Sequence, residues 1–97
     1  MEQDTLLLRT AEFYKALSDY SRFKIVHSLL NKEKCVSEIV DEVNMSQTAV
    51  SYQLKILRQM HLVKYRRVGQ NIFYSIDDEH VYEIINLTLE HMSHHKD

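Results

Sequence analysis

The sequence predicts a mainly α-helical fold that contains one β-hairpin. Proline is absent and glycine occurs once in 97 residues, so the chain lacks the residues on which irregular loops depend. Apolar residues recur at helical spacing along most of the chain. The spacing changes to alternation on both sides of Gly69, which is typical of a hairpin.

The first third of the chain predicts two helices. Residues 4–17 place a broad apolar side on the first helix: Leu6, Leu7, Ala11, Phe13, Tyr14 and Leu17. Asp19 or Ser21 can cap a second helix that extends to Leu30. Its inward side chains are Phe23, Val26, Leu29 and Leu30. Residues 31–34 are polar and predict a turn.

A short helix and a longer one follow. Ser37 is a suitable cap for the short helix, which directs Ile39, Val40 and Val43 inward. Asn44 tolerates the left-handed conformation that ends helices, and Ser46 can cap the next helix, over about 47–59. That helix buries three residues at helical spacing: Val50, Leu54 and Leu57.

The remaining elements are a hairpin and a last helix. Residues 62–67 and 71–76 form the strands, and Gly69 lies in the turn, where a positive φ is needed. Asp77 and Asp78 suit the start of a helix that runs to about His94, because carboxylates are favoured there by the helix dipole. Two helices joined by a short turn and followed by a hairpin predict a winged helix-turn-helix.

The charge distribution favours DNA binding, although the net charge is −2. The 34 residues between Glu42 and Asp77 contain no acid and carry five cations. We expect DNA contacts from one helix face and from the hairpin: Gln47, Thr48, Ser51, Tyr52, Gln53, Lys55, Lys64, Arg66, Arg67 and Gln70. The alternatives are a chance run of charge on a solvated face and a winged helix that binds protein.

Other classes of protein are not expected. Cys35 is the only cysteine, so no disulfide forms within the chain, and a cytoplasmic location is expected. The charged N-terminus and the absence of a long apolar run predict neither a signal peptide nor a membrane span. Without a His-Glu-x-x-His motif or a glycine-rich loop, neither an enzyme nor a small-molecule substrate is expected. We expect a single domain over residues 1–97.

Residues from about 11 to 76 resemble the ArsR/SmtB family of bacterial metal-responsive repressors. The resemblance rests on FYKALSD at 13–19 with Arg22 and Ile25, CVSEI at 35–39, SQ at 46–47, VSYQLKIL at 50–57, and VGQ at 68–70 before Tyr74. It implies a homodimer, formed through the terminal helices, that represses by binding operator DNA. An inducer then releases the repressor, and the controlled genes include a metal exporter.

The thiol-type metal site of that family uses a Cys-x-Cys pair, and this chain has Ser37 at the second position. A hydroxyl is a poor ligand for soft metals, so we expect Cys35 to be a small, partly buried residue. The alternative is a repressor of the same family that responds to a thiol-reactive or non-metal signal through Cys35.

The C-terminal helix carries a second set of metal-ligand residues. His80, His91 and His94 share one helical face, but His80 and His91 are about 16 Å apart along the axis. An antiparallel pair of these helices would bring Asp78 and His80 of one chain to His91 and His94 of the other. This set suits Zn²⁺ or Co²⁺, with two ions per dimer. The alternative is a solvated histidine-rich tail.

The spacing Asp-x-His-x10-His-x2-His also resembles the zinc- and cobalt-sensing branch of the family. That resemblance implies coupling between a ligand histidine, His91, and the backbone carbonyl of His61, between the DNA-reading helix and the hairpin.

Overall fold

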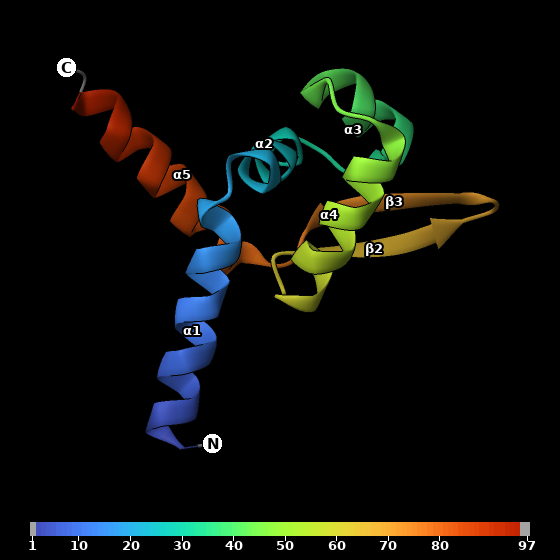
Figure 1. Ribbon diagram of the computed structural model, residues 1–97. Coiled ribbons are helices and arrows are strands. Elements are labelled where there is room, and N and C mark those ends of the chain that lie inside the picture. Colours follow the sequence, from blue (N-terminus) through green and yellow to red (C-terminus); the bar gives the residue numbers. More distant parts are fainter. Residues whose placement is uncertain (1, 96–97) are drawn as a thin grey trace.

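The computed structural model describes residues 2–95, so the first and the last two residues of the expected domain lie outside it. The chain forms five helices and three strands within this range (Figure 1). In order, they are α1 (Gln3–Ser18), α2 (Tyr20–Ser28), β1 (Lys34–Cys35), α3 (Val36–Val43), α4 (Gln47–Gln59), β2 (Val63–Val68), β3 (Asn71–Ile76) and α5 (Glu79–His94). The prediction of a winged helix-turn-helix is confirmed: α3 and α4 are the two helices, and β2 and β3 are the wing.

The core lies where α2, α3, α4 and the base of the sheet meet. Its fully buried apolar side chains come from all of these elements and, at Ile85, from the last helix α5: Ile25, Val26, Ile39, Val50, Leu54, Leu57, Leu62, Val63 and Ile85. The predicted inward face of α4 is confirmed, because Val50, Leu54 and Leu57 are no more than 1% exposed. This packing fixes the orientation of α4 relative to the wing.

The sheet has the strand order β1-β3-β2, and both pairs are antiparallel. Directly paired residues project to the same face, and neighbouring residues alternate. Val63 and its partner Ile76 lie on the inner face, together with Tyr65 and Arg67. Lys64 and Arg66 project from the other face of β2.

Three local predictions need correction. The polar turn at 31–34 ends one residue earlier, because Lys34 and Cys35 form β1 beside β3. As a result α3 begins at Val36 with Cys35 as its N-cap, and Ser37 lies inside the helix. The second helix ends at Ser28 instead of Leu30.

The predicted caps Asp19 and Ser46 are confirmed. Their side chains accept hydrogen bonds from the backbone N–H groups of Arg22 and Ala49.

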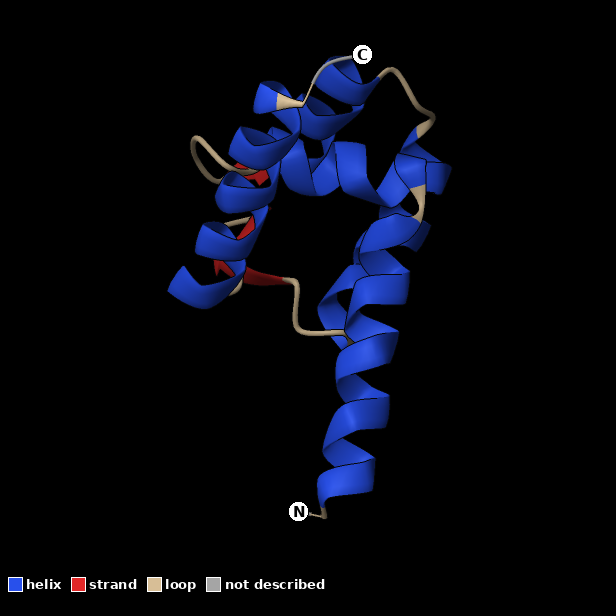
Figure 2. Cartoon of the chain, turned by 90° about the vertical axis from the view of Figure 1, so that its left-hand side faces the viewer, coloured by secondary structure: helices blue, strands red, loops and turns tan. Residues whose placement is uncertain are grey.

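Helices α1 and α5 project from this core (Figures 1 and 2). Most of the predicted apolar side of α1 is uncovered, since Leu6, Leu7 and Tyr14 are each at least half exposed and Ala16 alone on α1 is buried. Leu87 on α5 is 65% exposed. None of the helices in the described part of the chain is both long enough and apolar enough to span a membrane.

Candidate DNA interface and metal ligands

Helix α4 presents a polar surface on the side opposite the core. The side chains of Gln47, Thr48, Ser51, Tyr52 and Lys55 are all exposed. Ser46 holds the start of the helix, because its hydroxyl accepts the N–H of Ala49 at 3.1 Å. The acid-free surface predicted for this helix is therefore exposed on a single helix, which is the element that the major groove of a DNA duplex admits.

Gln53 differs from the other residues expected on this surface. It is half-buried, and its Oε1 accepts a hydrogen bond from Nη1 of Arg22 at 3.1 Å. The same guanidinium donates through Nε to the carbonyl of Ala16 at 2.8 Å. Gln53 thus joins α4 to α2 and to the last turn of α1, a role that the sequence pattern does not indicate.

The wing carries its cations on two different faces. Arg67 shares the inner face with Tyr65, whose ring lies 4.9 Å from the guanidinium carbon of Arg58 on α4. Lys64 and Arg66 occupy the other face, and Gln70 lies exposed in the turn beside Gly69, which has the predicted positive φ of 62°.

Arg66 is engaged in an ion pair that sequence analysis missed. Its Nε donates to Oε2 of Glu33 at 2.8 Å, and its Nη2 donates to the other carboxylate oxygen. Glu33 lies in the turn before β1, 33 residues away in sequence. The hydrogen bonds from Arg66 hold the pKa of Glu33 below its ordinary value.

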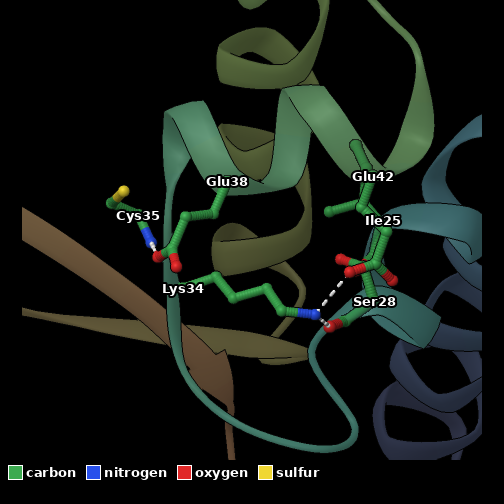
Figure 3. Close-up of polar contacts among 6 residues, drawn as sticks. All are labelled: Ile25, Ser28, Lys34, Cys35, Glu38 and Glu42. Carbon is green, nitrogen blue, oxygen red and sulfur yellow. Dashed lines mark hydrogen bonds and ion pairs between the residues drawn. The ribbon is translucent and has the colours of Figure 1, made fainter.

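Lys34 is a buried cation with two partners (Figure 3). Its Nζ donates to Oε1 of Glu42 at 2.6 Å and to the backbone carbonyl of Ser28. The lysine therefore connects the end of α2 to α3, and its charge is compensated as buried charges require.

Asp78 and His80 lie together at the start of α5. Asp78 caps the helix, because its Oδ1 accepts the N–H of Val81 at 3.1 Å, and its Oδ2 lies 3.5 Å from Nδ1 of His80. The bond from Val81 is the main reason that the pKa of Asp78 is below its ordinary value; His80 lowers it further. Its position as the cap of α5 thus places the Asp78 carboxylate beside the ring of His80.

His91 and His94 lie in the last turn of α5 and are exposed. The ring of His91 is 4.5 Å from that of His95, to which sequence analysis gave no role. Within residues 2–95 of one chain, no three metal-ligating side chains come together. The structure therefore brings Asp78 to His80 but leaves the two expected ligand pairs at opposite ends of one helix.

His61 lies between α4 and β2 and has a left-handed backbone, with φ 60°. Its N–H donates to the carbonyl of Arg58 at 3.1 Å. The residue borders a groove of about 860 Å³ between α1, the end of α4 and the start of α5, and Asp78 and His80 line the same groove. One groove thus holds the expected coupling residue and the first expected ligand pair.

Cys35 is partly buried, as predicted. Its Sγ lies 3.2 Å from Oγ of Ser37, and its N–H donates to Glu38 at 3.0 Å. The residue acts in the structure as the cap of α3.

Comparison with known proteins identifies the relatives of this chain. Residues 19–65 match the family described as bacterial regulatory protein, arsR family. A transcriptional repressor SmtB homolog from Synechocystis is 44% identical over 82 residues, which cover 84% of this chain and 62% of that protein. A cadmium resistance transcriptional regulatory protein CadC homolog from Staphylococcus aureus is 37% identical and is covered over 68% of its length.

A solved structure matches nearly the whole chain. It is the homodimeric winged helix-turn-helix DNA-binding domain of a possible ArsR-family transcriptional regulator from Mycobacterium bovis. The TM-score is 0.88 at 31% identity, and the match covers 98% of this chain and 92% of that one. The fold and these relatives are those of transcriptional regulators and not of enzymes.

Proposed function

Because this chain belongs to the arsR family of bacterial regulatory proteins, we propose that it binds operator DNA as a homodimer and leaves it when Zn²⁺ or Co²⁺ binds. The observation that supports this proposal is that α4 and the wing carry five cations and no acidic residue, while Asp78 and His80 lie together at the edge of an open groove. The regulated genes would include one for metal efflux. The expected cytoplasmic location remains a prediction.

DNA binding is supported by the arrangement of α4 and the wing. The exposed side chains of α4 can reach base edges in the major groove, which admits one helix. Arg67 and Lys64, which project from opposite faces of β2, can contact phosphates of the DNA backbone beside that groove. Gln53 and Arg66, which have partners within the chain, are weaker candidates for direct DNA contact.

Metal binding is supported by the chemistry of the donors. Three imidazoles and one carboxylate fit a tetrahedral Zn²⁺ or Co²⁺ site. Asp78 and His80 of one subunit would supply half of each site, and His91 and His94 of the other subunit would supply the rest. When bound, the metal would crosslink the two α5 helices at each end, so a dimer would take up two ions.

Coupling to DNA requires that metal and DNA favour different dimer conformations. A ligand histidine retains an N–H on its second ring nitrogen, and the partner of that N–H orients it. We expect His91 to donate to the carbonyl of His61, which lies between the recognition helix α4 and the wing. Such a bond would favour a dimer geometry with low DNA affinity.

Absorption spectroscopy with Co²⁺ tests this proposal. The purified protein should bind one Co²⁺ per chain and show d–d bands of tetrahedral nitrogen and oxygen ligation without a thiolate charge-transfer band. The same titration should release a fluorescent DNA duplex that the protein has selected from a random pool. Thiolate bands, or undiminished DNA binding at saturating Co²⁺ and Zn²⁺, would contradict the proposal.

A further inference from the structure

We propose that Glu33 is a positioning residue for DNA binding: it anchors the wing through Arg66, so that Arg66 holds β2 in place instead of contacting phosphate. The inference rests on the proposed DNA binding. It extends that proposal by assigning different roles to two neighbouring cations of the wing.

The sheet register determines where Arg66 can reach. Arg66 pairs with Phe73 on β3, and Phe73 pairs with Cys35 on β1, so these three side chains share the outer face of the sheet. The guanidinium carbon lies 5.8 Å from the centre of the Phe73 ring. The Arg66 side chain therefore crosses β3 toward β1, and its charged end meets Glu33 at the far edge of the sheet.

The pairing geometry is specific. Two donors of one guanidinium meet both oxygens of one carboxylate, an arrangement that is stronger and more directional than a single contact. By contrast, Arg67 projects from the inner face of β2. The same face carries Tyr65, which contacts Arg58 on α4. Arg67 is thus the wing arginine on the side of the recognition helix.

Glu33 is held firmly because the next two residues have other partners. Lys34 is buried between Ser28 and Glu42, and Cys35 caps α3. Three consecutive residues therefore connect the wing, the α2–α3 junction and the start of the helix-turn-helix (Figure 3 shows the latter two). Through Glu33, the position of the wing is therefore fixed relative to α2 and α3, against which α4 packs.

Charge exchange between positions 33 and 66 tests the assignment. DNA affinity is measured by fluorescence anisotropy on a duplex selected by the wild-type protein from a random pool. Glu33→Gln and Arg66→Gln should each lower affinity about three- to fivefold, since an exposed pair contributes modestly. The double variant Glu33→Arg/Arg66→Glu should recover most of that loss. Arg67→Gln is the matched control, and its loss should add to that of Glu33→Gln.

A direct contact between Arg66 and phosphate would change DNA affinity in the opposite direction in two of these variants. If Arg66 contacted phosphate, Glu33→Gln would free it and raise affinity, and the exchanged variant would bind most weakly because its acid at position 66 would face DNA. Either result, or no change in any variant, overturns the proposal.

Hydrogen exchange separates this inference from the proposed function. Glu33→Gln should accelerate exchange of β2 amides in the free protein, whereas Arg67→Gln should not. This measurement tests whether Glu33 anchors the wing without requiring DNA. If the wild-type protein were found not to bind DNA, that result would overturn the proposed function alone. Unchanged exchange in Glu33→Gln would overturn the anchor alone.

Discussion

The helix-turn-helix with its wing and the pair of terminal helices differ in how completely one chain buries them. Every element from α2 to β2 contributes side chains to a closed core, apart from the short β1, whose lysine is buried in a polar site. Helix α1 buries one residue, and α5 buries Val81 and Ile85. Leu7, Leu87 and Met92 are each more than half exposed on these helices.

The difference indicates which part of the function needs a second chain. The surface proposed to read one half-site of the DNA is complete within one subunit, whereas two half-sites require the dimer. The proposed metal sites are divided, because each end of α5 carries only part of a ligand set. The exposed apolar residues on α1 and α5 suit a partner helix, and the homologous domain from Mycobacterium bovis is homodimeric.

The largest effect is expected from charges placed on the terminal helices. Leu7→Glu with Leu87→Glu should prevent dimer formation and lower DNA affinity about a hundredfold or more, because two half-sites no longer bind together. Analytical ultracentrifugation and anisotropy measure the two effects. Tyr20→Ser, which changes a still more exposed residue on α2, is the control. A dimeric double variant would contradict the division between the two regions.

Mixing two variants that each lack one half of the ligand set tests whether the metal site forms between two subunits. His80→Ala and His91→Ala should each retain DNA binding but lose metal-driven release. An Asp78→Ala/His80→Ala chain and a His91→Ala/His94→Ala chain should bind no Co²⁺ tightly alone. Their heterodimer should regain one tetrahedral site, since one combination of ends is intact. If heterodimers form and Co²⁺ spectra do not return, the sites are not intersubunit.

A smaller effect is expected in the region that is complete in one chain. Ser51→Ala or Tyr52→Ala should weaken binding by about 1–3 kcal/mol for each base that the side chain reads, and should alter preference among duplexes. Arg67→Ala should weaken binding to all sequences and reduce its salt dependence. Anisotropy on selected and random duplexes measures both. Equal weakening on the two kinds of DNA for the α4 variants would contradict base recognition by these side chains.

The smallest effect is expected at the thiol. Cys35→Ser should leave metal-driven release unchanged, because Cys35 caps α3 and its neighbour on that turn is the hydroxyl of Ser37. Titration of Zn²⁺ into the DNA complex measures this. Loss of the response in a folded Cys35→Ser protein would favour the alternative of a repressor that acts through this cysteine.

Local sequence signals predicted most of the helices and the hairpin, because caps such as Ser46 and the turn at Gly69 act on their own neighbours. Strand β1 was missed because its two residues are defined by pairing with β3, far along the chain. Lys34 was missed as a core residue because a lysine is rarely buried without a partner, and Glu42 cannot be recognised as that partner from spacing. The same holds for Glu33 and Arg66.

The left-handed backbone at His61 also limits how this scaffold can be redesigned. With φ 60°, His61, the second residue after α4, must tolerate a conformation that β-branched side chains avoid. A recognition helix grafted from another protein would therefore need glycine, asparagine or another tolerant residue at its exit. With valine or isoleucine there, the transplanted helix would leave the wing misaligned, however well its outer face suited a new target sequence.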